Sequence, residues 1–413
     1  MQEIKRINVD RETLEYGIIV VLSVISYLFL MWILTGRGLF THNVYDSYAI
    51  QANAWRMGHL DIPENYGYLE IAVYKGKYFI SFPPFPSYIL FPLTFIFGQN
   101  TPDSMLLWLA DIVTSLYLYK LALRFKNSPR ASALCALFVM LGTNVTFNML
   151  NPWVWFWAQT LCFMLSVMAI YYAFEGKGGL CLGLWACAVG CRPMQAVFVP
   201  ILLYILYRKE RNNDPDISPL GIIRKRLIWA LPPCLIGGSY MLLNYLRFDN
   251  PLEFGHNYLQ EFMEAEYGQF DPHYFSNNFK LLFHIPEFDD EGRMVIDHFG
   301  NLNMFIVSPF VIFAIVLVVA LIAKKQWKSA MRNIVIMCFC VIYMVITMMH
   351  KTMGGWHFGN RYSNDILPWI YLTVALGLSR VKKAAKYQIP IMIFGMCLNA
   401  VGLVVVYNDL YRM

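Results

Sequence analysis

Residues 37–97 read RGLFTHNVYDSYAIQANAWRMGHLDIPENYGYLEIAVYKGKYFISFPPFPSYILFPLTFIF. They form the first long polar segment of the chain, and they end in an apolar run that does not look like an ordinary membrane crossing. Asp46 precedes a short helical pattern. Tyr48, Ala52 and Trp55 recur on one face of that pattern, as in an amphipathic helix. The sequence therefore predicts a short surface helix that begins at an acid.

The second half of the stretch predicts a hairpin and a further helix. Val73–Ile80 carries Lys75-Gly76 at its middle, a two-residue turn signal. Pro83 and Pro84 then start an apolar helix that later prolines keep short or kinked. Two helices on the bilayer surface, with a carboxylate at the start of the first, would hold an acid at the membrane–water boundary. That acid is the leading candidate for the chemistry of the chain.

The composition is that of a membrane protein. Of 413 residues, 58% are hydrophobic and 15% are charged. Apolar runs of about 20 residues recur, which is the length a helix needs to cross the hydrocarbon core. The nine cysteines lie in apolar segments, which indicates packing residues rather than disulfides or a metal cluster. We predict an all-α polytopic membrane protein with about 11 transmembrane helices, at residues 17–35, 104–123, 131–148, 154–174, 178–190, 193–207, 227–246, 304–323, 331–349, 365–379 and 388–407.

The basic residues predict the orientation. With the N-terminus in the cytoplasm, most of the 33 lysines and arginines fall on the cytoplasmic side, as the positive-inside rule requires. Counting residues 82–98 as a crossing would place the basic cluster at 120–130 outside. This segment is therefore predicted to be an outer-surface or re-entrant helix. The net charge of +6 could suggest a nucleic-acid partner, but the basic residues are distributed as the membrane topology requires, so no nucleic-acid partner is predicted.

Three polar regions share the predicted outer face. We predict one transmembrane domain over residues 1–413, in which residues 36–103 form a first extracytoplasmic loop with juxtamembrane helices. The acidic residues 247–303 form an extracytoplasmic cap segment, with a helix near 257–266. The third region is the turn at 350–365. Binding groups gathered on one face imply a site at the extracytoplasmic surface of a cell membrane.

Residues 350–365 read HKTMGGWHFGNRYSND, a glycine-rich turn that carries basic side chains. Glycines let a backbone approach a ligand closely. Lys351, His357 and Arg361 could bind phosphate, and arginine forks to phosphate oxygens bidentately. The alternative is an interfacial turn whose bases reach toward lipid head groups, with Trp356 in an aromatic belt. We favour phosphate binding for Arg361 and the interfacial role for Lys351.

Other candidate residues also have structural alternatives. Arg192 stands at a break between two segments that are each too short to span a membrane, and an intramembrane arginine usually faces a cavity or a partner. Asp111, inside a predicted crossing, could be that partner in an ion pair. Aspartate is a favoured N-cap, so Asp46 could simply cap its helix. The aromatic run at 153–157 is more typical of an interfacial belt than of a sugar platform.

With these motifs assembled, the chain resembles the GT-C superfamily of polytopic glycosyltransferases that use polyprenyl-phosphate sugars. Within it, the chain is most similar to bacterial relatives of protein O-mannosyltransferases and aminoarabinose transferases. Each matching motif alone is weak, while their order and their common outer side are specific, and they cover most of the chain. The motifs are Asp46-x-Tyr48, Gly76-x-Tyr78, Pro83-Pro84, Arg192-Pro193, Pro251-Leu-Glu-Phe-Gly255 and Gly354-Gly-Trp-x-Phe-Gly-x-Arg361-Tyr362.

The resemblance implies roles for the candidate residues. Asp46 would be the catalytic base, and the turn at Arg361 would be part of the donor-phosphate site. Many relatives carry paired acids at the position of Asp46, but here the neighbours are Tyr45 and Ser47. Whether a divalent metal binds is therefore left open, and no cofactor is predicted with certainty. The full set is Asp46 for catalysis, Arg361, His357, Arg192 and Tyr362 for phosphate binding, and Tyr48, Pro83, Pro84, Trp356 and His256 for the substrate cavity.

The expected activity follows from these roles. We predict an integral-membrane inverting glycosyltransferase that moves a sugar from a polyprenyl-phosphate donor, in the bilayer, to an extracytoplasmic acceptor, which could be a cell-envelope glycan, a lipid or a protein. The alternative is a polytopic transporter or flippase for lipid-linked or small polar substrates. Transporters tend to show inverted repeats and paired broken helices. The sequence shows one broken pair and no repeat.

Overall fold

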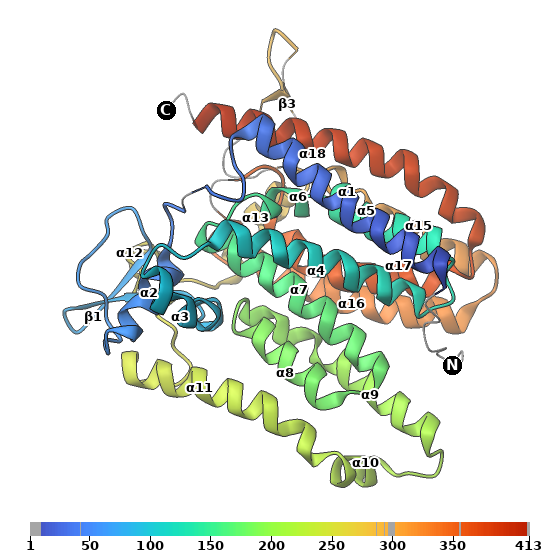
Figure 1. Ribbon diagram of the computed structural model, residues 1–413, viewed down its shortest axis with the longest axis horizontal. Coiled ribbons are helices and arrows are strands. Elements are labelled where there is room, and N and C mark those ends of the chain that lie inside the picture. Colours follow the sequence, from blue (N-terminus) through green and yellow to red (C-terminus); the bar gives the residue numbers. More distant parts are fainter. Residues whose placement is uncertain are drawn as a thin grey trace. The chain divides into compact units, whose positions relative to one another are not determined.

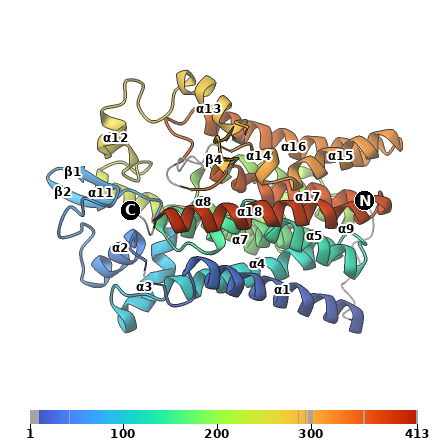
Figure 2. The same ribbon diagram turned by 90° about the horizontal axis from the view of Figure 1, so that it is seen from above.

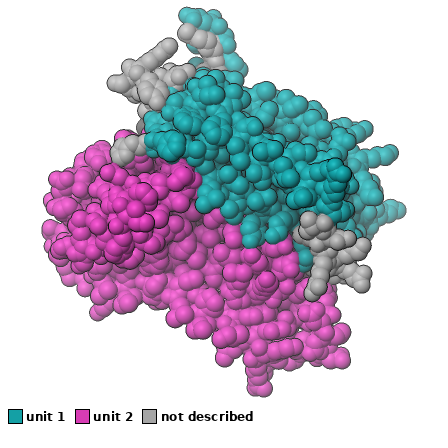
Figure 3. Space-filling model, viewed as in Figure 1, with its two compact units in different colours: residues 1–41, 108–151, 272–413 teal, residues 42–107, 152–271 magenta. Residues whose placement is uncertain are grey.

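The computed structural model describes residues 10–41, 43–285, 287–292, 294–295, 302–354 and 357–410 (Figures 1 and 2). It is predominantly α-helical, and the strands of these residues form only two small antiparallel hairpins. The chain divides into two compact units (Figure 3). Unit 1 comprises residues 1–41, 108–151 and 272–413, and unit 2 comprises residues 42–107 and 152–271. The single transmembrane domain stays a prediction.

Unit 1 is a bundle of apolar helices. Helices α1, α5 and α18 lie side by side, and α17 packs against α5, α15 and α16 (Figures 1 and 2). Its elements are α1 (Arg11–Thr35), most of α4 (Asp103–Leu123), α5 (Pro129–Leu141), α6 (Val145–Met149), η4 (Pro272–Tyr274), α13 (Phe275–Leu282), β3 (Glu287–Phe288), β4 (Met294–Val295), α14 (Met304–Val307), α15 (Phe310–Ala323), α16 (Trp327–Met348), η5 (Arg361–Ile366), α17 (Leu367–Leu378), η6 (Lys382–Tyr387) and α18 (Gln388–Leu410).

Small residues and buried hydrogen bonds hold this bundle together. A Cβ at Gly395 of α18 would lie 2.1 Å from the carbonyl oxygen of Gly142, so only glycine permits this approach to the end of α5. Asn333 Nδ2 donates to the backbone carbonyl of Thr373 at 2.8 Å and links α16 to α17. Helices in an apolar environment associate through such close packing and interhelical hydrogen bonds.

Unit 2 combines the first polar loop with a second set of helices. Helix α8 packs against both α7 and α11 (Figure 1). Its elements are α2 (Ser47–Arg56), β1 (Ile71–Tyr74), β2 (Lys77–Ile80), α3 (Phe85–Phe97), α7 (Val154–Glu175), α8 (Gly178–Val189), η1 (Pro193–Phe198), α9 (Val199–Asn213), α10 (Pro219–Lys225), η2 (Leu227–Ala230), α11 (Leu231–Phe248), η3 (His256–Tyr258) and α12 (Gln260–Met263).

The elements predicted in the first loop are present. Strands β1 and β2 pair around Lys75 (φ 49°) and Gly76 (φ 74°), and two consecutive left-handed residues are what a two-residue hairpin turn requires. Pro84 is the N-cap residue of α3, which contains Pro92. With 13 residues, α3 is too short to cross a hydrocarbon core of about 30 Å.

Six helices are long and apolar enough to span a membrane within the described residues: Arg11–Thr35, Asp103–Leu123, Val154–Glu175, Leu227–Phe248, Trp327–Met348 and Lys382–Tyr407. The all-α polytopic membrane fold is therefore confirmed. The other five predicted crossings coincide with shorter helices. Four of these are interrupted by a turn or begin with a short helical piece, as α14 precedes α15 and η1 precedes α9.

The acidic segment at 247–303 is divided between the two units at residues 271 and 272. The helix predicted near 257–266 is shorter than expected, because the chain there forms η3 and α12, which are joined at Leu259.

Candidate active site

Asp46 begins α2, but its carboxylate does not cap that helix. The backbone carbonyl of Asp46 accepts from the N–H groups of Ala49 and Ile50, as an N-cap residue should. The side chain makes no capping hydrogen bond. Instead, Asp46 Oδ2 accepts from Gln99 Nε2 at 2.8 Å, with the residue 8% exposed. The capping interpretation of this carboxylate is therefore wrong.

A buried hydrogen-bond network fixes α2. Arg247, 3% exposed, donates from Nη1 to Gln51 Oε1 at 3.0 Å and to the carbonyl oxygen of Ile80 at 3.1 Å. Gln51 Nε2 donates to Ser87 Oγ at 2.9 Å, and Ser87 donates to the carbonyl oxygen of Tyr48 at 3.0 Å. Helices α2, α3 and α11 are thus tied together around one arginine. Sequence analysis missed both Arg247 and Gln51, although each is a polar residue on a buried helix face.

Aromatic rings lie beside the acid. The Tyr45 ring centroid is 5.2 Å from that of Trp155 and 6.4 Å from that of Tyr68. Partial desolvation and the negative charge of Asp46 raise the pKa of the Tyr68 phenol, which places the carboxylate close to it. Trp155 Nε1 donates to Glu70 Oε1 at 2.9 Å. The site therefore places an acid beside aromatic rings that are exposed (Tyr68) or partly exposed (Tyr45 and Trp155), and such rings can pack on sugars.

The remainder of the aromatic run does not form a lipid-facing belt. Trp153, Phe156 and Trp157 are 5%, 1% and 1% exposed. They pack inside the protein at the start of α7 instead of facing outward. The interfacial-belt interpretation of this run is therefore wrong for these three residues.

The predicted cavity residues of unit 2 lie together. Tyr48 is 2% exposed, and its hydroxyl has no hydrogen-bond partner in the described part of the chain. Burial raises the pKa of Tyr48, while the charge of the nearby Arg192 opposes this shift. The Phe82 ring centroid is 5.9 Å from that of Tyr48 and 5.6 Å from that of His256. Tyr48, Arg192 and His256 thus form one cluster, named here the Tyr48 cluster.

Pro83 and Pro84 extend this cluster. Both are buried, and the Phe85 N–H after them donates to the carbonyl oxygen of Gly190 at 3.1 Å. That bond fixes the start of α3 against the end of α8, two residues before Arg192. The helix break predicted at Arg192 is present between α8 and η1.

His256 should make stability depend on pH. Its Nδ1 lies 2.6 Å from the carbonyl oxygen of Ser81, and desolvation lowers its pKa from 6.5 to about 4. The unfolded chain therefore binds more protons than the folded chain between these two values. We expect the melting temperature to fall as the pH falls below 6.5, and to stop responding to His256 below about pH 4.

A melting series from pH 7.5 to 4 measures this effect. His256→Gln keeps a donor for Ser81 and should flatten the curve. The exposed His59→Gln variant is the control and should leave the curve unchanged. An unchanged slope in His256→Gln would contradict a neutral histidine at this position.

Arg361 lies in unit 1 and is largely buried by contacts with residues of its own turn. It is 5% exposed, its N–H donates to His357 Nε2 at 3.0 Å, and its guanidinium carbon lies 5.2 Å from the centroid of the Tyr362 ring. Gly354 has φ 100°, and a Cβ there would lie 3.1 Å from Arg361 Nε. The glycine that was expected to approach a ligand therefore approaches the guanidinium. His357, with no exposed surface, positions the Arg361 backbone through Nε2.

An asparagine anchors the same turn. Asn144 Nδ2 donates to the carbonyl oxygen of Phe358 at 3.0 Å and to Asn399 Oδ1 at 3.2 Å. At Gly359 (φ 84°), a Cβ would lie 2.4 Å from Asn144 Nδ2. An aspartate at 144 has no hydrogen to donate, so asparagine suits this position.

The described residues contain no group of three or more His, Cys, Asp or Glu side chains that could hold a metal ion. Asp111 belongs to unit 1, and its Oδ2 has no hydrogen-bond partner among the described residues. It is not held in an ion pair through that oxygen.

The structure thus sorts the predicted residues into two groups, and Trp356 lies outside the described residues. Unit 2 contains Asp46, Tyr48, Pro83, Pro84, Arg192 and His256, and unit 1 contains His357, Arg361 and Tyr362.

No family model matches the chain, and no curated protein matches it. Among solved structures, it is similar to the Archaeoglobus fulgidus oligosaccharyltransferase in the apo form, with TM-score 0.52 and 10% identity over 96% of this chain and 56% of that one. It is also similar to ArnT from Cupriavidus metallidurans bound to undecaprenyl phosphate, with TM-score 0.49 and 13% identity over 90% and 61%.

The likeness to the oligosaccharyltransferase confirms the predicted GT-C fold. The chain spans just over half of that protein's length.

Proposed function

We propose that this chain is an integral-membrane inverting glycosyltransferase, which moves a sugar from a polyprenyl-phosphate donor to an extracytoplasmic acceptor. The observation that carries the proposal is the nearly buried carboxylate of Asp46, which makes no capping bond to its helix and lies beside partly exposed aromatic rings. The same unit contains Arg192 in the Tyr48 cluster. An acid and an arginine are the groups needed to deprotonate an acceptor and to stabilise a phosphate.

The reaction is a single displacement at the anomeric carbon. The acceptor hydroxyl oxygen forms a bond to that carbon as the bond from the carbon to the phosphate oxygen breaks. The acceptor proton passes to Asp46, and the electron pair of the broken bond stays on the polyprenyl phosphate. Attack from the face opposite the phosphate inverts the anomeric configuration. The acceptor class, whether a cell-envelope glycan, a lipid or a protein, belongs to the proposal.

Each group in unit 2 has one proposed role. Asp46 accepts the proton, and Arg192 stabilises the charge that develops on the leaving phosphate. The Tyr48 hydroxyl, buried with no partner in the described residues, can donate to the same phosphate. Tyr45 and Trp155 can pack against a sugar ring. Arg247 contacts none of the reacting atoms in this scheme and positions α2.

Arg361 is proposed separately as a phosphate ligand, because it belongs to unit 1. Its guanidinium is held between Gly354 and the ring of Tyr362, which fixes the planar fork in one orientation. A fixed fork loses little side-chain entropy when it binds a phosphate.

Photoaffinity labelling with a diazirine-bearing polyprenyl phosphate tests the donor site. We expect labelled peptides from the Tyr48 cluster, with excess unlabelled polyprenyl phosphate as a competitor and polyprenol as a poor one. Arg192→Gln should weaken binding about tenfold, because it removes a charge-assisted hydrogen bond. Arg56→Gln, an exposed arginine of the same unit, is the matched control. Equal competition by polyprenol, or equal binding by both variants, would contradict the site.

A further inference from the structure

A cavity of about 640 Å³ lies in unit 1, and none of the candidate site residues discussed above lines it. It is lined where α1 begins, where α4 ends and α5 begins, and where α17 ends and η6 follows. Helix α17 separates Ser379, Lys382 and Ala385 of this lining from Arg361 in the sequence. This is also the end of the helices that the positive-inside rule predicts to face the cytoplasm.

The cavity is positively charged. Arg124, Lys126 and Lys382 line it, and among the described residues Asp10 is the one acid that does so. Arg124 is 7% exposed, so its charge lies largely out of water, where charge interactions are stronger. A cavity with three bases and one acid favours an anion.

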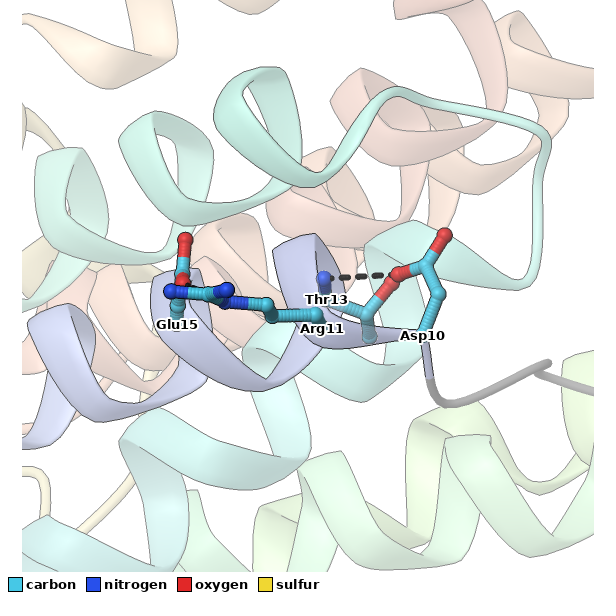
Figure 4. Close-up of polar contacts among 4 residues, drawn as sticks. All are labelled: Asp10, Arg11, Thr13 and Glu15. Carbon is cyan, nitrogen blue, oxygen red and sulfur yellow. Dashed lines mark hydrogen bonds and ion pairs between the residues drawn. The ribbon is translucent and has the colours of Figure 1, made fainter.

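Asp10 forms no ion pair with Arg11, the neighbouring base on its own helix. Its Oδ1 accepts from the Thr13 N–H at 2.8 Å, and Arg11 turns away from it to pair with Glu15 at 2.7 Å (Figure 4). Hydrogen bonds from Thr13 lower the pKa of Asp10. The carboxylate therefore caps α1 as a charged group, and the balance of charge in the cavity stays positive.

The polar groups of the lining indicate that the ligand should also carry a hydrogen-bond donor. Asn127 Nδ2 donates to the carbonyl oxygens of Ala122 and Ala375, each at 2.9 Å, and these two bonds fix the orientation of the amide. Its Oδ1 has no hydrogen-bond partner among the described residues, although Asn127 is only 8% exposed. A buried acceptor of this kind calls for a donor, such as a hydroxyl group. Ser128 caps the 13-residue helix α5 here, and the start of a helix favours negative charge.

We propose that this cavity binds a phosphate ester that carries a hydroxyl group, such as the head group of phosphatidylglycerol. The phosphate is bound by Arg124, Lys126 and Lys382, and the hydroxyl donates to Asn127. Soluble glycerol phosphate has the same chemistry and is the other possible source. The proposal does not rest on the glycosyltransferase function.

Thermal melting of the purified full-length protein in a neutral detergent tests this site. The protein is titrated with phosphatidylglycerol, phosphatidylcholine or sn-glycerol 1-phosphate, and its 11 tryptophans report unfolding. We expect phosphatidylglycerol to raise the melting temperature and phosphatidylcholine to leave it unchanged. The double variant Lys126→Gln/Lys382→Gln should need about tenfold more phosphatidylglycerol for half of the shift.

The matched control is Arg130→Gln/Lys383→Gln, which removes the same charge from exposed neighbours that do not line the cavity. It should respond like the wild type. A shift with glycerol phosphate that also needs the two lysines supports the site with a soluble source, and a shift with the lipid alone supports the lipid source. No shift with either phosphate, or equal weakening in both double variants, would overturn the proposal.

Discussion

Asp46→Asn should lower the rate of sugar transfer at least ~100-fold, the usual size of a general-base contribution, while the protein stays folded. Asparagine removes the proton acceptor but keeps an oxygen that can accept from Gln99. The carboxylate makes no capping bond, so α2 loses no side-chain cap in this variant. Transfer rate and melting temperature are measured on the same preparation.

Two further variants separate the base from its surroundings. Asp46→Ala should be as inactive as Asp46→Asn and nearly as stable. If the carboxylate capped the helix, replacement by alanine would instead lower the free energy of unfolding by about 1 kcal/mol. Gln99→Ala removes the hydrogen-bond donor but keeps the carboxylate, so it should retain most of the transfer rate. A fully active Asp46→Asn would leave the protein without its proposed base, and the transporter alternative would then be favoured.

Arg361→Lys should weaken donor binding and turnover about tenfold or more, although it keeps the positive charge. Lysine lacks the planar fork that Gly354 and Tyr362 hold in place. Donor binding and transfer are measured separately, because loss of the fork should affect both. Lys351→Gln changes a half-buried base in the same turn that has no proposed role in phosphate binding, and it should behave like the wild type. Wild-type transfer by both Arg361→Lys and Arg361→Ala would show that the turn is purely structural.

The membrane helices could be predicted because each apolar run must satisfy its own backbone hydrogen bonds in lipid. Every predicted crossing corresponds to a helix or to a helix with a short neighbouring piece, and the hairpin at Lys75-Gly76 is where its turn residues place it. The breaks near Asn144 and Ser308 fall inside the predicted crossings 131–148 and 304–323, and helix length and hydropathy alone did not place them there. They depend on contacts with other segments, such as the bond from the Asn144 N–H to Ser308 Oγ.

The candidate site could be predicted only where local chemistry is unusual. Asp46 was identified because it precedes an amphipathic helix, and Arg361 because it lies in a glycine-rich turn with other bases. Arg192 was identified because it stands at a break between two short apolar segments. Arg247 and Gln51 were missed, because the bond between them joins residues 196 positions apart and leaves no local pattern.

The basic cavity of unit 1 could likewise be predicted only in part. The topology predicted that Lys126 and Lys382 lie on one side of the membrane. It could not predict that both line one cavity with Asp10, which needs the packing of three distant segments.

The most direct test of the central claim follows a labelled sugar in proteoliposomes that contain the purified protein and a polyprenyl-phosphate sugar. A glycosyltransferase releases polyprenyl phosphate and moves the label onto an added acceptor, and Asp46→Asn abolishes this release. We predict that result. Label that crosses the bilayer while still attached to its carrier, equally in the wild type and in Asp46→Asn, would contradict the account and identify a transporter.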